Sequence, residues 1–192
     1  MSSPNSDFRS GKDVVTYLVQ QHEQIKALFQ QVSETRGDER SEAFVALRRL
    51  LAVHETAEEE VVHPKAKQSI ADGENVIAER LQEENEAKQK LADLESLDVE
   101  SAEFETLFRE LQADVLLHAQ AEEEHEFSQL AEALDDDQLQ RMRNAAELAE
   151  SMAPTRPHAG VESAPANLLA GPFAAMLDRA RDALSGKTNS AG

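Results

Sequence analysis

Two short phrases in this chain combine histidine and glutamate at a spacing that suits metal binding. Residues 54–60 read H-E-T-A-E-E-E, and residues 118–124 read H-A-Q-A-E-E-E. In each phrase a His stands four residues before a Glu, so on a helix both side chains lie on the same face. Imidazole and carboxylate groups are both metal ligands. Two such pairs in one small domain indicate a dinuclear metal site.

The duplication extends upstream of both phrases. Residues 21–26 (Q-H-E-Q-I-K) match residues 83–88 (E-E-N-E-A-K) in spacing. The first stretch precedes its His-x-x-x-Glu phrase by nearly the same number of residues as the second. The chain is therefore expected to contain two helix–helix units, each of which contributes to one site.

Four stretches carry apolar or ligand-type residues at alternating steps of three and four, the pattern of bundle helices rather than of strands. The stripes comprise Val14, Leu18, His22, Ile25, Phe29 and Val32; Phe44, Leu47, Leu51, His54, Glu58 and Val61; Ile77, Leu81, Glu84, Ala87, Leu91 and Leu94; and Phe104, Phe108, Leu111, Val115, His118, Glu122 and His125. The helix breakers Gly37, Pro64 and Gly73 fall between these stretches. We expect an all-α fold, an up-down-up-down four-helix bundle.

The chain beyond the fourth stretch predicts three further pieces. A short fifth helix is expected over about 136–151, behind three consecutive Asp residues that suit a helix N-terminus. Prolines within 153–165 predict an extended linker, and an amphipathic helix is expected over about 168–185. The predicted organisation is a disordered N-terminus over 1–12, the bundle with its added helix over 13–152, and a tail over 153–192.

Some stripe positions hold a polar residue where an apolar one is expected, and these are the candidate metal ligands: His22, His54, Glu58, Glu84, His118 and Glu122. A buried, ionised carboxylate is costly unless it is paired. No Lys or Arg occurs on the four stripes to pair with these carboxylates. A bound cation would satisfy all of these groups. The alternative is a network of protonated and hydrogen-bonded side chains.

Several polar residues beside the candidate ligands have open roles. Glu55 could be an extra bridging ligand at the edge of the site. His125 is either a further ligand, a group that orients a carboxylate, or a packing residue at the end of the core. His63 precedes Pro64, where we expect a helix end and a packing or dipole-facing role rather than ligation. Tyr17, about a turn from His22, is expected to pack, and a hydrogen bond to the site is the alternative.

The chain as a whole is strongly acidic. The formal net charge of the 192 residues is −19, which repels nucleic acid and argues against a phosphate-binding surface. The carboxylates that follow the two histidines are expected to face solvent: Glu59, Glu60, Glu123 and Glu124. The absence of Cys excludes disulfides and thiolate metal sites. No signal peptide or membrane span is expected, so the prediction is a cytoplasmic protein that binds no membrane.

The order of these residues resembles the bacterial hemerythrin-like (HHE cation-binding) domain. The likeness covers about residues 13–132 and rests on His22 and the two His-x-x-x-Glu phrases, and the phrase P-T-R-P-H at 154–158 is similar to the tail of actinobacterial members. The resemblance implies a four-helix bundle with two non-haem irons (Fe2+/Fe3+), bridged by carboxylates and by an oxo or hydroxo group. Glu58 and Glu122 would be the bridging carboxylates.

The third helix departs from this family pattern. The family has a His there, in a phrase such as E-E-H-x-E, whereas residues 83–86 read E-E-N-E. The stripe selects Glu84 as the replacement ligand. A carboxylate in place of an imidazole makes the site harder and more anionic. We therefore expect it to stabilise ferric iron and to accept manganese or zinc, and not to carry oxygen reversibly.

Three functions remain open at this point. The first is a di-iron protein that binds or senses dioxygen, peroxide or nitric oxide, or that handles iron and oxidants, because the candidate ligands leave coordination positions open. The second is an enzyme with peroxidase, catalase-like or ferroxidase turnover at the same centre. The third is a helical interaction protein whose metal site has degenerated. In any of the three, the segment 168–185 could dock on the bundle or on a protein partner.

Overall fold

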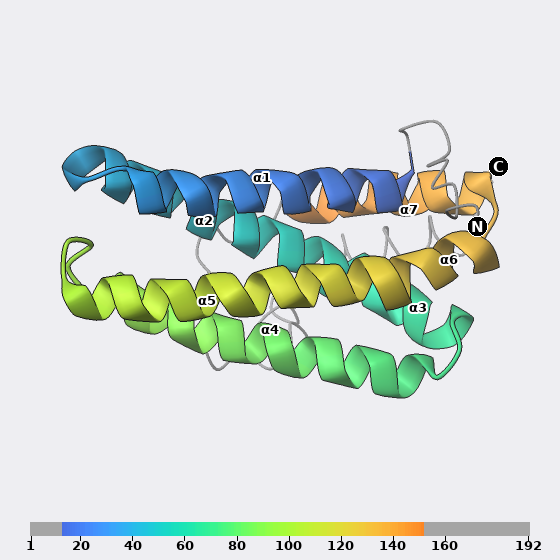
Figure 1. Cartoon of the computed structure of the whole chain (residues 1–192). Helices are drawn as coiled ribbons and strands as arrows, with labels where there is room; N and C mark the ends of the chain where they lie inside the picture. Colours follow the sequence, from blue (N-terminus) through green and yellow to red (C-terminus); the bar gives the residue numbers. More distant parts are fainter. Residues whose placement is uncertain (1–12, 152–192) are drawn as a thin grey trace, which may run out of the picture.

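The computed structural model describes residues 13–151, and the regular structure in this range is entirely helical. The chain forms an up-down-up-down bundle of long helices with one further helix packed on its side (Figure 1). This arrangement confirms the predicted fold class. The N-terminal segment 1–12, the linker and the amphipathic segment 168–185 lie outside the described residues.

Two of the long helices are composite, because each contains a π-helical turn. In chain order the elements are α1 (Val14–Glu34), α2 (Gly37–Ala57), η1 (Glu58–Val62), α3 (His63–Ser69), α4 (Gly73–Glu95), α5 (Ala102–Ala121), η2 (Glu122–Phe127), α6 (Ser128–Ala133) and α7 (Asp136–Glu150). The π-helical segments η1 and η2 join α2 to α3 and α5 to α6 without a break. Each begins at the Glu of a duplicated His-x-x-x-Glu phrase. Such turns are rare and often mark functional sites.

The ends of the helices follow local chemistry. At the start of α1, Asp13 accepts a hydrogen bond from the backbone N–H of Thr16 at 2.8 Å. At the start of α7, Asp135 and Gln138 form a reciprocal capping box. Between α3 and α4 the chain turns so tightly that a Cβ on Gly73 would lie 2.7 Å from a backbone carbonyl oxygen. The helix α7 confirms the predicted fifth helix, and the capping box marks its start.

The apolar core is divided into two clusters with a polar layer between them. One cluster surrounds the turn from α1 to α2 and includes Ile25, Phe29, Phe44, Leu47, Leu91, Phe104, Phe108 and Val115. The other lies at the opposite end and includes Leu18, Val61, Val62, Ile77, Phe127, Leu130, Met142 and Ala146. Each long helix passes from one cluster to the other at its candidate ligand; on α1, for example, His22 stands between Leu18 and Ile25. The core thus places the candidate ligands at mid-height.

The fifth helix belongs to the bundle rather than to a separate unit. Its apolar face contributes Leu139, Met142, Ala145 and Ala146 to the second core cluster. It packs beside α1, α2 and η1 (Figure 1). Burying an apolar side chain of this kind contributes about 1.5–3 kcal/mol for a residue of the size of Met or Leu. The apolar face of α7 therefore stabilises the second core cluster, at the end of the bundle opposite the turn from α1 to α2.

The prediction of a helix end at Pro64 was wrong. The helix continues past this residue to Ser69. A proline in a helix interior lacks the N–H that would bond to the preceding turn. The π-helical turn η1 stands directly before Pro64, and the backbone N–H of His63 bonds to the carbonyl of Glu58, five residues earlier. The wider turn absorbs the irregularity, so the helix is not terminated.

Two stripe positions were also assigned incorrectly. Leu81 is 43% exposed, and Arg80 occupies the buried face of α4 in its place. On the fourth helix His125 is exposed, whereas Glu126 is buried. On the fourth helix the π-helical turn η2 holds one more residue than an α-helical turn, which moves the buried stripe by one position. No π-helical turn lies in α4, and nothing in the structure explains the shift at Leu81. The remaining apolar stripe residues are buried, which confirms the periodic pattern elsewhere.

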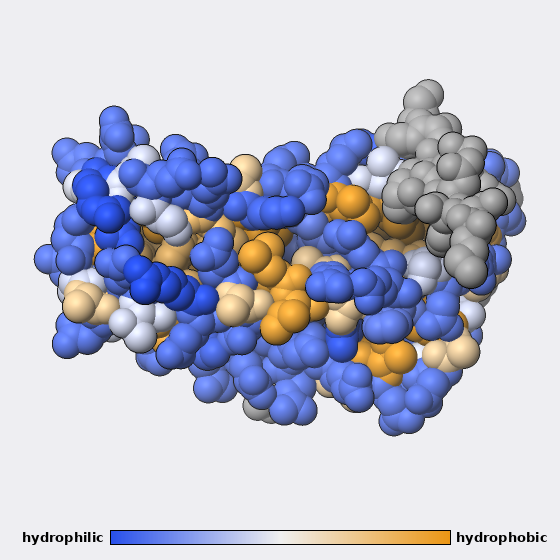
Figure 2. Space-filling view, in the orientation of Figure 1, coloured by the Kyte–Doolittle hydropathy of each residue, from blue (hydrophilic) through white to orange (hydrophobic). Residues whose placement is uncertain are grey.

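The visible surface is mostly hydrophilic, with apolar residues gathered near the middle of the face in Figure 2. Among the large apolar residues, Leu117 of α5 is the most exposed of those described, at 65%. Within residues 13–151, no helix is both long and apolar enough to cross a membrane.

Candidate metal centre

The predicted ligand residues meet in the polar layer and form two overlapping groups. In what we call the first position, ligand atoms of His22, His54, Glu58 and Glu122 lie within 4.8 Å of one another. In the second position, the same holds for Glu58, Glu84, His118 and Glu122. Glu58 and Glu122 therefore belong to both positions. All four long helices contribute, so the complete set exists only in the folded bundle.

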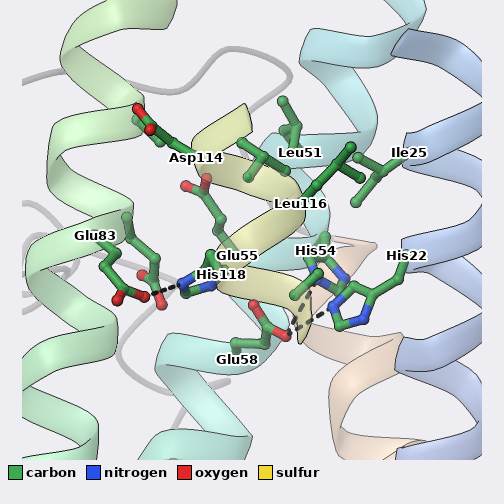
Figure 3. Close-up of a pocket in the computed structure, with 14 residues that line it drawn as sticks. His22, Ile25, Leu51, His54, Glu55, Glu58, Glu83, Asp114, Leu116 and His118 are labelled. Atoms are coloured by element: carbon green, nitrogen blue, oxygen red, sulfur yellow. Dashed lines mark hydrogen bonds and ion pairs between the residues drawn. The ribbon is translucent and has the colours of Figure 1, made fainter. Parts of the chain in front are cut away.

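The inward-facing nitrogen of each imidazole is its Nε2 atom. In the first position, Nε2 of His54 lies 3.2 Å from Oε1 of Glu58, and Nε2 of His22 lies 3.4 Å from Oε2 of Glu122. In the second position, Nε2 of His118 lies 3.3 Å from Oε1 of Glu122. Separations of this size are those expected between ligand atoms that each bind one cation at about 2.0–2.2 Å. Figure 3 shows the His22 and His54 rings turned toward the Glu58 carboxylate.

The outward-facing Nδ1–H of each imidazole donates a hydrogen bond to a neighbouring side chain. His22 donates to Glu123 at 2.8 Å, His54 to Gln21 at 2.7 Å and His118 to Glu83 at 2.8 Å. In metal sites such bonds fix the tautomer that leaves Nε2 free for the cation, and they orient the ring. The three bonds therefore prepare the three imidazoles for ligation. Glu123 is half-exposed but bonded to His22, so the prediction that it only faces solvent was incomplete.

Two of these bonds continue into longer chains. Gln21 donates to Glu150 of α7 at 2.9 Å, and Glu150 accepts a second bond from the Tyr17 hydroxyl at 2.6 Å. On the other side of the site, Glu83 accepts from Arg80 at 3.2 Å. The first chain links Tyr17 and the fifth helix to His54, so Tyr17 does more than pack. Its pKa is raised by burial and by the neighbouring Glu150 carboxylate.

The shared carboxylates lack well-formed hydrogen bonds. Both oxygens of Glu58 and both oxygens of Glu122 are buried without one, and neither residue has any exposed surface. Their nearest neighbours are the imidazole nitrogens at 3.2–3.4 Å. A buried carboxylate whose oxygens lack hydrogen bonds costs several kcal/mol. The nearby imidazoles hold the pKa of Glu122 well below its usual range despite burial, which keeps this carboxylate ionised. An ionised, buried carboxylate whose oxygens lack hydrogen bonds is suited to bind a cation.

His22 and His118 hold protons where a cation would otherwise supply the charge. Burial opposes the protonated form of His22, yet the neighbouring carboxylates of Glu122 and Glu123 raise its pKa to about 9. For His118, burial also opposes protonation, while the neighbouring carboxylates of Glu122 and Glu83 raise the pKa well above the usual range. Because an imidazole must lose its proton to bind metal, cation binding at these positions releases protons.

Glu84 has protein partners that the sequence did not predict. Nε2 of His63 lies 2.6 Å from Oε1 of Glu84, and Nζ of Lys88 lies 3.6 Å from Oε2. Burial raises the pKa of Glu84, but His63 and Lys88 outweigh it and lower the pKa. Lys88 is one helical turn beyond Glu84 and folds back over it, so the absence of cations from the stripes did not mean their absence from the site. The second position is therefore partly neutralised by the protein itself.

Lys88 also forms ion pairs with Glu55 and Glu59. Its Nζ lies 3.3 Å from Oε2 of Glu55 and pairs with Glu59 as well. Glu55 is buried and faces the same space as the ligands but is in neither cation position. Burial raises its pKa to about 8, with Lys88 opposing the shift. The prediction that Glu59 faces only solvent was incomplete, because Lys88 pairs with it.

His63 and Glu126 were missed as residues of the polar layer. Both are buried, and Nδ1 of His63 lies 3.1 Å from Oε1 of Glu126. Glu126 stands four residues after Glu122, so continuing the steps of four along the helix would have found it. His63 stands five residues after Glu58, a spacing that only the π-helical turn brings inward. No ordinary helical periodicity would have selected it.

A small cavity adjoins the two positions. Its volume is about 30 Å³, and its lining includes His22, His54, Glu58, Glu84 and His118 together with apolar residues of α1, α2 and α5. Space of this size holds about one or two water-sized molecules. The cavity is thus far too small for an organic substrate.

Comparison with known families identifies the fold and the kind of site. The family model of the hemerythrin HHE cation binding domain matches residues 13–130, from the start of α1 into α6, with both His-x-x-x-Glu phrases. The chain belongs to the hemerythrin HHE family. This membership implies that the hemerythrin domain binds cations, which agrees with the His and Glu groups in the polar layer.

Individual relatives of the hemerythrin domain are distant. An uncharacterized hemerythrin-like protein of Schizosaccharomyces pombe is 28% identical over 134 residues, which cover 69% of this chain and 66% of that protein, slightly less than two thirds of its length. A crystal structure of a hemerythrin HHE cation binding domain-containing protein from Mycobacterium kansasii superposes with a TM-score of 0.65 at 19% identity. It covers 88% of this chain and 98% of that one. The second likeness supports the fold.

Proposed function

We propose that this hemerythrin domain holds two first-row transition-metal cations, iron foremost, and binds a small oxygen or nitrogen-oxide ligand beside them. The first position offers two imidazoles and two carboxylates, and the second offers one imidazole and three carboxylates. Imidazole suits iron and zinc, and carboxylate suits manganese and other hard cations. When bound, the cations would supply Lewis-acid and one-electron redox chemistry. Glu58 and Glu122, which belong to both groups, would bridge them.

The observation that carries this proposal is the state of the two shared carboxylates. Glu58 and Glu122 are fully buried with all their oxygens unbonded, although imidazoles surround them. A structural network of the alternative kind would satisfy such oxygens with protons and hydrogen bonds, because leaving them unmade is costly. The network instead directs its hydrogen bonds outward, from Nδ1 of each His, and leaves the centre open.

The size of the adjoining cavity selects the class of ligand. At about 30 Å³ it fits dioxygen, peroxide or nitric oxide. Apolar side chains such as Ile25, Leu51 and Val115 form part of its wall, which suits an uncharged diatomic molecule. We therefore favour binding, sensing or handling of these small molecules over chemistry on an organic substrate.

A second candidate function is turnover of peroxide, and Glu55 favours it. This carboxyl group lines the cavity, and burial raises its pKa to about 8, with Lys88 opposing the shift. A protonated carboxyl beside a ligand can act as a general acid. Repeated loss of peroxide per chain, reduced in a Glu55→Gln variant that keeps its metal, would establish this activity. Peroxide binding without turnover would leave the binding function alone.

The first experiment is to measure metal content per chain after expression in iron-supplemented medium, with the near-ultraviolet spectrum and the melting temperature. We expect at least two irons per chain, a charge-transfer band of a bridged iron pair and a higher Tm than that of the stripped protein. His125→Ala is the matched control, because this exposed histidine is outside both positions. A folded helical protein that takes up no iron and shows no change in Tm would instead support the interaction-protein hypothesis.

A further inference from the structure

A third group of potential ligands lies beside the two proposed positions. Ligand atoms of His63, Glu122 and Glu126 lie within 4.8 Å of one another, and all three residues are buried. His63 and Glu126 are outside the duplicated His-x-x-x-Glu phrases. In the duplicated sequence, the place of Glu126 is taken by Val62 in the first copy, and the place of His63 is taken by Phe127 in the second. This group is therefore separate from the repeated pattern that predicted the other ligands.

The two π-helical turns create the group. His63 directly follows η1, and Glu126 lies within η2 next to its last residue. Each turn shifts the buried stripe by one residue, and the two shifted stripes face each other where the second and fourth long helices meet. The α3 and α6 segments that follow pack against each other. Two such turns at the same level bring one imidazole and one carboxylate to the same point.

His63 has the hydrogen-bond pattern of the other three histidines, but the roles of Nδ1 and Nε2 are reversed. Its Nε2 bonds to the Glu84 carboxylate at 2.6 Å, as the Nδ1 atoms of the other three histidines bond to their neighbours. Its Nδ1 faces Oε1 of Glu126 at 3.1 Å. A ligating His commonly donates its second N–H to a carboxylate. His63 can keep its bond to Glu84 while Nδ1 binds a cation.

Buried oxygens without partners complete the set. Oε2 of Glu126 and both oxygens of Glu122 have no hydrogen bond, and neither side chain is exposed. These oxygens lie in the same group as a nitrogen of His63. One imidazole and two carboxylates suit a divalent first-row cation such as Fe2+, Mn2+ or Zn2+, and three protein ligands leave coordination positions open.

We propose that His63, Glu122 and Glu126 form a third cation position, next to the dinuclear centre and joined to it through Glu122. A cation there is a divalent first-row metal. The proposal rests on the proposed function only through Glu122, which all three positions share. His63, Glu126 and the two π-helical turns belong to the third position alone.

The test is a crystal structure of the full chain soaked in Zn2+, with an anomalous difference map at the zinc edge. We expect a peak within about 2.0–2.2 Å of Nδ1 of His63 and of oxygens of Glu122 and Glu126. No peak at this place at saturating Zn2+ overturns the proposal. Peaks at the first and second positions are judged separately, so a failure of the dinuclear centre is distinguished from a failure of the third position.

Solution stoichiometry provides the matched comparison. After anaerobic loading with Fe2+ and desalting, we expect three metals per chain in the wild type and in His125→Gln, and two in His63→Gln and in Glu126→Gln. The substitutions to Gln keep the size of the side chain, and circular dichroism checks that each variant is folded. Two metals in the wild type, with one in His63→Gln, would overturn the third position and show that His63 only supports Glu84 at the second.

Discussion

The first and second cation positions share two carboxylates but differ in how the protein has prepared them. At the first, His22 and His54 turn their Nε2 atoms toward the shared carboxylates, and both rings are oriented through Nδ1. At the second, a single imidazole is joined by Glu84, which already bonds to His63 and pairs with Lys88. A cation at the second position must therefore compete with the protein's own positive charges. A duplicated phrase therefore does not guarantee two equal cation positions, because side chains of neighbouring helices set the charge around each position.

The largest expected effect comes from removing a ligand that both positions share. Glu122→Gln keeps the size of the side chain and removes its charge, so we expect the metal content to fall from the wild-type value to nearly none. Elemental analysis of the purified variant measures this. Glu124→Gln on the same helix turn is the control, because Glu124 is exposed. Retention of both metals in Glu122→Gln would mean that Glu122 is not a bridge.

Removing one imidazole from each position separates the two. His118→Ala should lose the second cation and keep the first, and His54→Ala should do the reverse, because each residue belongs to one group only. Metal content and the loss of spectroscopic coupling between two irons would report the change. Unchanged metal content in His118→Ala would refute the second position as described.

Stability of the cation-free protein should fall as the pH rises, since protonated His22 stabilises its carboxylate neighbours. Its folded pKa is about 9 against an ordinary value of 6.5, so this contribution is complete below pH 6.5 and is lost as the pH rises through 9. Glu55, with its pKa raised to about 8, acts in the same direction. Facing His22 are Glu58, Glu122 and Glu123.

We expect His22 alone to lower the free energy of unfolding of the stripped protein by about 3 kcal/mol between pH 6.5 and pH 9.5, and Glu55 to add to this fall. Urea unfolding at a series of pH values measures it. The metal-loaded protein should not show this decline, because its imidazoles are already neutral. A stripped protein that is equally stable at both pH values would contradict the role assigned to His22.

A smaller effect is expected from the residues that orient the imidazoles. Gln21→Leu removes the acceptor for Nδ1 of His54 and breaks the chain to Glu150 and Tyr17. Loss of such a partner typically lowers metal affinity by about 10–100-fold. Competition with a metal-binding dye should show weaker binding at the first position and unchanged binding at the second. Equal weakening at both would indicate a general loss of stability.

The finest test restores an imidazole to the third long helix. Glu84→His removes one carboxylate from the second position and should bring its donor set to two imidazoles and two carboxylates, equal to that of the first. We expect iron to be favoured over manganese at this position by roughly tenfold more than in the wild type. Metal analysis after growth with both metals, together with the charge-transfer spectrum, measures the change. An unaltered spectrum would mean that Glu84 is not a ligand.

The sequence predicted most of the bundle because its periodic stripes reflect a one-dimensional property, the burial of one face of each helix. His22, His54, Glu58, Glu84, His118 and Glu122 stand on those stripes, and the structure places them together in the two groups. The π-helical turns could not be predicted, because they change the number of residues per turn only locally. For this reason the helix was expected to end at Pro64, although η1 carries it past His63. His125 was expected on the buried face because a step of three was taken from Glu122, whereas a step of four leads to the buried Glu126.

By itself, the sequence determined the helices, their order and the position along each long helix where ligand-type residues replace apolar ones. Only the tertiary structure decided what surrounds those residues. Lys88 reaches Glu84 and Glu55 from outside the stripe, α7 connects Glu150 to His54 through Gln21, and η1 turns His63 toward Glu84 and Glu126. The physical reason is that long polar side chains find their partners across helices. Charge balance in a buried layer therefore depends on packing in three dimensions, whereas helix formation depends on neighbours along the chain.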